Sequence, residues 1–230
     1  MTRLILVAGA LLAGLPSPAV AQARPTPARP PAPRRIELAI GAGFAGGVTL
    51  GTRDATLQSN NTSGSPFRLF SSDTRLSPAA VVEGRLGYRL TPRLTIEAAM
   101  TVGRPDLTTS LSADAENAVP VEATETLTEY VVAGGASWRL LSGARRRWTP
   151  FVSGGAGLAR HVHEDRVLIE SGIDGYVGGG LIYPLGSART TTPRSGVRLD
   201  ARLHLLSGGV ADGAGVSPRG VLTGGVFVTF

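Results

Sequence analysis

Residues 86–99 read LGYRLTPRLTIEAA, two runs of alternating side chains joined by a proline-containing turn. Leu86, Tyr88 and Leu90 alternate with glycine and arginine before the turn, and Leu94 and Ile96 alternate with threonine and glutamate after it. Successive side chains of a strand point to opposite faces, so the pattern predicts two antiparallel strands, each with one apolar and one polar face.

The same two-residue period recurs in eight segments of about ten residues each. They span approximately 36–45, 80–90, 94–102, 130–140, 148–158, 177–185, 197–205 and 222–230. The connections alternate between short turns and long loops, and the long loops cover 51–78, 104–123, 161–173 and 206–217. This alternation is typical of outer-membrane barrels. The sequence therefore predicts an all-β fold, an eight-stranded antiparallel up-and-down transmembrane β-barrel.

The composition excludes several other classes of protein. Hydrophobic residues make up 42% and charged residues 17%, which excludes disorder for most of the chain. The 31 glycines argue against a coiled coil, and the absence of cysteine excludes disulfides and thiolate metal sites. The arginines are mostly dispersed, so we expect no nucleic-acid partner.

Two segments precede the predicted barrel, which covers 36–230. Residues 1–23 have the three parts of a secretory signal peptide: a cationic start, an apolar run, and A-x-A sites that predict cleavage near Ala21 or Ala23. Residues 24–35 contain five prolines and four arginines, which predicts an extended periplasmic linker. This linker is either a plain spacer or a basic tether to anionic headgroups.

Five aromatic residues on the apolar phase lie close to a short turn or to the C-terminus. They are Tyr88, Trp138, Trp148, Tyr183 and Phe230. All five would lie at one height, which predicts an aromatic girdle at the periplasmic interface of the membrane.

Four stretches carry a resemblance to a known family: 86–99, WTPFVSGGAGLA at 148–159, YVGGGLIYPL at 176–185, and the ending TGGVFVTF at 223–230. With them the chain resembles the eight-stranded outer-membrane barrels of the OmpA/OmpX-like superfamily. The resemblance implies an assembly signal in the last strand, formed by Thr223, Gly225, Val228 and Phe230, that the barrel-assembly machinery reads. It also implies contact with outer-membrane lipids and lipopolysaccharide, and a monomer. The sequence departs from some relatives in one feature: we expect no peptidoglycan-binding domain after the barrel.

The polar phase of the strands predicts the content of the lumen. It carries Glu37, Glu83, Arg85, Arg89, Glu97, Glu129, Arg139, Arg198, Asp200 and Arg202. An eight-stranded barrel is just wide enough for its own side chains, and buried charges need partners, so we expect an ion-paired plug. In the register set by the turn, Glu97 lies opposite Gly87, which predicts that it bridges Arg85 and Arg89.

Signs of catalysis are weak, and we expect no enzyme, no cofactor and no metal site. There is no Gly-x-Ser-x-Gly elbow, P-loop or dinucleotide fingerprint. His161 and His163, next to Glu164 and Asp165, offer metal-binding side chains, but we interpret this stretch as a solvated loop. A His-x-Ser pair, as in lipid A esterases of outer membranes, would need a serine where the sequence has His163.

The predicted function is therefore that of a bacterial outer-membrane protein with a structural or surface-exposed role. A narrow channel for ions or small solutes, similar to a porin, is the alternative. A soluble exported barrel with an apolar ligand cavity disagrees with the charged phase. In the loop 51–78, Phe67 and Phe70 are either ligand-binding anchors or a lid over the barrel mouth.

Overall fold

The computed structural model describes residues 35–57, 67–113, 119–140, 148–164, 168–185, 195–210 and 215–230. These ranges form twelve β-strands. No helix in the described part of the chain is long and apolar enough to cross a membrane. The predicted signal peptide, its cleavage sites and the linker up to residue 34 lie outside the described residues.

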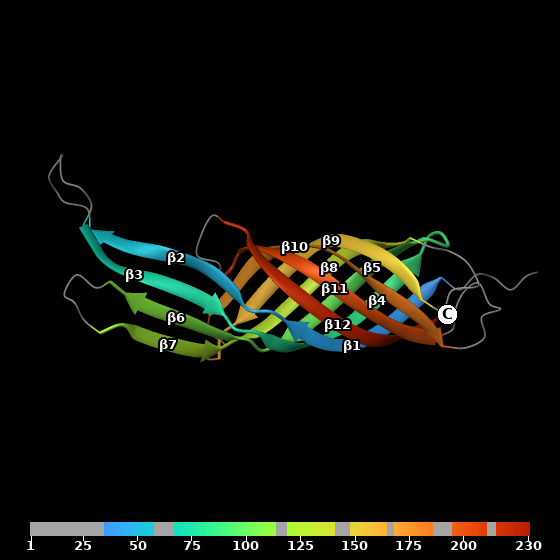
Figure 1. The fold of residues 1–230 in the computed structure, drawn as a ribbon, viewed down its shortest axis with the longest axis horizontal. Helices are drawn as coiled ribbons and strands as arrows, with labels where there is room; N and C mark the ends of the chain where they lie inside the picture. The colour runs from blue at the N-terminus through green and yellow to red at the C-terminus, as the bar shows by residue number, and fades with distance from the viewer. Residues whose placement is uncertain are drawn as a thin grey trace, which may run out of the picture. The chain divides into compact units, whose positions relative to one another are not determined.

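Eight strands close into a barrel in which neighbours in space follow one another along the chain (Figure 1). They are β1 (Ile36–Ala45), β4 (Ala79–Arg89), β5 (Leu94–Gly103), β8 (Thr128–Arg139), β9 (Thr149–Val162), β10 (Ile169–Leu185), β11 (Ser195–Gly208) and β12 (Ser217–Thr229). Every pair is antiparallel, and β1 closes the barrel by pairing with both β4 and β12. The eight predicted strands and the up-and-down barrel are confirmed.

The strand β4 shows how the sequence produces this barrel. Its side chains alternate between buried and exposed without a break from Ala79 to Arg89. The apolar Val82 and Leu86 are exposed, whereas the charged Glu83 and Arg85 are enclosed. A soluble barrel would bury its apolar phase, so the reversed arrangement is typical of barrels that lie in lipid.

The predicted loops at 51–78 and 104–123 are wrong, because most of their described residues form strands. β2 (Val48–Leu57), β3 (Phe67–Leu76), β6 (Asp106–Ser112) and β7 (Val121–Thr126) make a separate four-stranded sheet in that order (Figure 1). They prolong β1, β4, β5 and β8 after short interruptions, two of which contain Pro78 and Pro105. Proline has no N–H for the ladder, which explains breaks at these points.

Polar side chains of this sheet contact one another across its strands. Its strands therefore carry polar residues where the barrel strands alternate apolar and polar ones. The Thr126 hydroxyl donates to Asp106 over 2.7 Å, and the Thr52 hydroxyl donates to Asp73 over 3.1 Å. The loop predicted at 161–173 is also shorter than expected, since β9 continues to Val162 and β10 begins at Ile169.

We call the end of the barrel that carries the four-stranded sheet the hairpin end, and the opposite end the turn end.

A small apolar cluster lies where the sheet meets the hairpin end. It consists of Val48, Leu50, Leu76, Leu127 and Val210, with Leu107 packed against it. Leu50, Leu76 and Val210 also line a cavity of about 10 Å³ with the inward His161. The cluster therefore covers the lumen at the hairpin end.

The prediction that Phe67 and Phe70 form a lid over the barrel mouth is wrong. Both side chains lie on β3, where they are 59% and 37% exposed.

Candidate functional site

The inward faces of the barrel strands bring all ten charged residues of the polar phase into the lumen. They are Glu37, Glu83, Arg85, Arg89, Glu97, Glu129, Arg139, Arg198, Asp200 and Arg202, and each makes at least one ion pair. Nine of these residues are buried, and the Arg139 side chain is 12% exposed. The alternation along each strand is sufficient to place them there.

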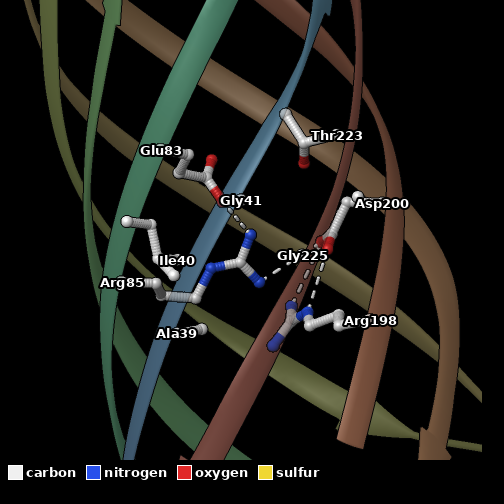
Figure 2. A pocket seen from close by; sticks show the side chains of 10 residues that line it. Ala39, Ile40, Gly41, Glu83, Arg85, Arg198, Asp200, Thr223 and Gly225 are labelled. Atoms are coloured by element: carbon white, nitrogen blue, oxygen red, sulfur yellow. Dashed lines mark hydrogen bonds and ion pairs between the residues drawn. The ribbon is translucent and has the colours of Figure 1, made fainter.

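The centre of the lumen is built around Glu97 on β5. Its carboxylate accepts hydrogen bonds from Arg198 on β11 at 2.7 and 3.1 Å, and one from the Ser137 hydroxyl. Arg85 on β4 lies 3.4 Å from the same carboxylate and 3.3 Å from Asp200. Figure 2 shows the guanidinium groups of Arg85 and Arg198 turned toward Asp200 from two sides. Three walls of the barrel thus meet in one cluster.

The predicted bridge from Glu97 to Arg85 and Arg89 is wrong in its second partner. Glu97 does lie opposite Gly87, but it bridges Arg85 and Arg198. Arg89 lies 3.5 Å from Glu37 on β1, nearer the turn end. The prediction considered only the adjacent strand, whereas a narrow lumen brings the far wall equally close.

Glu83 on β4 holds a second cluster on the hairpin side of Glu97. Arg202 donates two hydrogen bonds to it, at 2.5 and 3.0 Å, and Arg85 donates a third. The Thr101 hydroxyl adds a contact of 3.4 Å. Arg85 joins this cluster to that of Glu97, so the ion pairs form a continuous network along the barrel.

Near the hairpin end, Glu129 accepts hydrogen bonds from Arg219 at 2.7 and 2.8 Å and from His161 at 3.2 Å. Arg219 also donates to the Gly46 carbonyl over 2.7 Å. The sequence prediction missed Arg219 because it began the last strand near Leu222. Continuing the two-residue period back from the inward Thr223 would have found it.

A histidine–carboxylate pair next to this cluster was also missed. Asp174 on β10 accepts a hydrogen bond of 2.9 Å from His204 on β11, and the Tyr176 ring stacks on the His204 ring at 5.6 Å. Asp174 and Tyr176 precede the predicted start of their strand, but they share the inward phase. Glycine makes room for the tyrosine, since a Cβ at Gly155 would lie 2.7 Å from its ring.

The charges of this network cancel. Six carboxylates face six guanidinium groups among the described lumen residues, a net charge of −6 + 6 = 0 with neutral histidines. The cavity between Arg85, Arg198 and Asp200 measures about 10 Å³. That is space for about one water molecule. The lumen therefore contains a neutral plug made of its own side chains.

Apolar side chains complete the plug on its turn side. Phe151, Ile182 and Phe227 form a buried cluster in which the two phenylalanines are only 2% and 1% exposed. The Arg198 guanidinium lies 4.2 Å from the centroid of the Phe151 ring, a cation–π contact. These two phenylalanines occupy the inward phase, unlike the aromatic residues predicted for the membrane interface.

The five predicted girdle residues lie on the outward face near the turn end. Tyr88, Trp138, Trp148 and Phe230 are 43 to 62% exposed, and Tyr183 is half-buried. The rings of Trp148 and Tyr183 pack at 4.8 Å. Their amphipathic rings suit the membrane interface.

The residues of the predicted assembly signal belong to β12 and its end. Thr223 is buried, Gly225 is half-buried, and Val228 is 44% exposed on the outward face. The Phe230 amide donates to the Ile36 carbonyl over 2.9 Å. This end of the chain therefore takes part in closing the barrel.

The two neighbouring histidines do not share a ligand site. His161 pairs with Glu129 inside the lumen, whereas His163 donates to Glu125 over 2.8 Å beyond the strand. The described residues contain no group of three or more side chains suited to a metal ion, and Asp165 lies outside them.

The pKa of His163 is raised above its ordinary value of 6.5. Burial alone would lower this pKa, but it is outweighed by the hydrogen bond and charge of Glu125 and by the charge of Glu170.

No family model and no curated protein matches this sequence. Among solved structures, Neisserial surface protein A is 14% identical, with a TM-score of 0.51 over 84% of this chain and 97% of that one. The outer membrane protein OprG from Pseudomonas aeruginosa is 11% identical, with a TM-score of 0.48 over 86% and 97%. Ail of Yersinia pestis, solved with the heparin analogue sucrose octasulfate, is 13% identical, with a TM-score of 0.39 over 85% and 99%. The first likeness shows the fold, that of an eight-stranded outer-membrane barrel.

Proposed function

We propose that the chain is a bacterial outer-membrane protein with a structural or surface-exposed role and no enzymatic activity. The observation that carries this proposal is the neutral plug, in which six carboxylates and six guanidinium groups neutralise one another inside the barrel. Charges that are already paired and buried are poorly placed to bind a passing ion, because an ion that takes one partner leaves the other buried charge uncompensated. Among the described residues, the part available to partners is then the four-stranded sheet.

The outward face supports the location. Its strands expose apolar side chains such as Ile40, Leu158 and Leu222, which are 61 to 65% exposed. Lipid covers such a belt in outer-membrane barrels, with aromatic girdles at the interface. The turn end then faces the periplasm and the sheet faces the outside. The partners are outer-membrane lipids, lipopolysaccharide and, during biogenesis, the barrel-assembly machinery, and the protein acts as a monomer.

Membrane fractionation and bilayer recording test the proposal together. We expect the protein in the outer-membrane fraction, with a gel mobility that changes when the folded barrel is boiled. In planar bilayers we expect no steady conductance above the bilayer alone. A protein found in the soluble periplasmic fraction without a heat shift would contradict the location. A steady conductance would contradict the closed plug and favour a narrow, porin-like channel.

A further inference from the structure

A groove crosses the outward face of β10, β11 and β12. Gly179, Ala201 and Gly224 form its floor, and the side chains of Leu199 and Leu222 rise beside it. Ala201 is paired with Gly179 on one side and with Leu222 on the other, while Gly224 is paired with Leu199. Small and large residues thus alternate on neighbouring rungs of the sheet. The volume between these side chains is about 560 Å³, and the groove is open on its outer side.

Only apolar side chains face this outer groove. Phe44, Leu199 and Leu222 are 53, 45 and 61% exposed along its walls. Asp200 and Thr223 lie behind its floor, but they belong to the inward phase, and Asp200 pairs with Arg198 inside the lumen. A ligand in the outer groove therefore meets hydrocarbon and main chain, with no charge to bind.

One end of the outer groove points to the aromatic girdle. Leu181 lines this end and precedes Tyr183 by two residues, a distance of about 7 Å along a strand. Tyr183 packs against Trp148 at the turn end of the barrel. A lipid acyl chain that enters at the periplasmic interface would therefore reach the groove directly.

We propose that the outer groove holds one acyl chain of a phospholipid from the periplasmic leaflet. This inference rests on the membrane location proposed above. A flexible hydrocarbon chain can lie in a groove whose side chains include Leu199 and Leu222. A second copy of the protein fits less well. A two-fold interface places the same patch of both copies together, so the groove of one copy would face the groove of the other and leave a space between them.

Photochemical labelling of the full chain tests this assignment. The protein is placed in phospholipid vesicles that contain a phospholipid with a photoactivatable group at the end of one acyl chain. After illumination, mass spectrometry of peptides locates the label. We expect it to concentrate on residues 199–203 and 222–224, compared with the outward Met100 and Val132 on β5 and β8.

Ala201→Phe fills the outer groove, and Ala98→Phe is its matched control on the outward face of β5. We expect the first variant to lose the concentrated label and the second to keep it. Equal labelling around the barrel, or unchanged labelling of Ala201→Phe, would overturn the inference. Concentrated labelling only by a photoactivatable lipid A would overturn the assignment to a phospholipid. The heat shift on gels is measured on the same samples, so a protein that fails to insert contradicts the membrane location instead.

Discussion

Glu97 and Arg198 face each other from opposite walls of the barrel and join through two hydrogen bonds of 2.7 and 3.1 Å. Their strands, β5 and β11, are four places apart in a ring of eight, which is the greatest possible separation. Both side chains are about 95% buried. The contact therefore spans the lumen at its centre, in a barrel whose width is set by the number and tilt of its strands.

Replacing Glu97 tests the importance of this contact. Glu97→Leu removes the closest carboxylate partner of the buried Arg198 and leaves it with Asp200 at 3.0 Å and Glu37 at 3.8 Å. Loss of one partner of a buried ion pair costs about 3–5 kcal/mol. We expect the urea midpoint of the heat-shifted gel band to fall. Glu122→Gln, at an exposed position of β7, is the control and should leave the midpoint unchanged. Equal midpoints for both variants would show that the central cluster does not stabilise the barrel.

Two adjacent glycines on β8 differ in the face they occupy. A Cβ at Gly135 would collide with the hydroxyl of Tyr176 in the lumen and would lie 2.9 Å from the Gly155 Cα. A Cβ at Gly134 meets nothing within 4 Å. Overpacking costs about 1–3 kcal/mol, so Gly135→Ala should lower the urea midpoint and Gly134→Ala should not. The reverse order would mean that Tyr176 does not fill the lumen at this height.

The two tryptophans of the chain, Trp138 and Trp148, report on the position of the girdle. Because both are exposed near the turn end, we predict stronger quenching of their fluorescence by lipids brominated near the headgroup than by lipids brominated at the chain end. Stronger quenching by the deep bromine would place the girdle away from the interface.

The contact between His163 and Glu125 predicts a dependence on pH. The folded protein raises the pKa of His163 above its unfolded value of about 6.5. The stabilisation from the charged imidazole is therefore complete below about pH 6.5 and is lost as the pH rises through the raised pKa. Glu125→Gln should lower this pKa in an NMR titration, because Glu125 supplies the hydrogen bond and the nearest charge. An unchanged titration would show that the contact does not form.

The barrel strands were predictable because their apolar residues recur with period two over about ten positions. The sheet of β2, β3, β6 and β7 was not, since strands such as β6, with sequence DLTTSLS, carry polar residues on both phases. Their partners are each other, and a Ser- and Thr-rich segment next to a turn resembles a loop when taken alone. Pairing between distant strands, not local pattern, decides their structure.

The phase of the charged residues was also predictable, but their partners were not. Alternation places Arg89 and Arg219 inward, yet it does not say that Arg89 turns to Glu37 or that Arg219 crosses to Glu129. Those choices depend on the register and tilt of eight strands together. The missed Asp174 and Arg219 lie just before the predicted starts of their strands, where ends are least certain.

Spin labels on β4 test the central claim, that the outward phase meets lipid and the inward phase fills the barrel. The chain has no cysteine, so Val82→Cys and Leu86→Cys each give one label on the outward phase. In vesicles, both labels should collide with dissolved oxygen far more often than with a water-soluble nickel complex. More frequent collisions with nickel than with oxygen at both positions would contradict a barrel that spans the membrane.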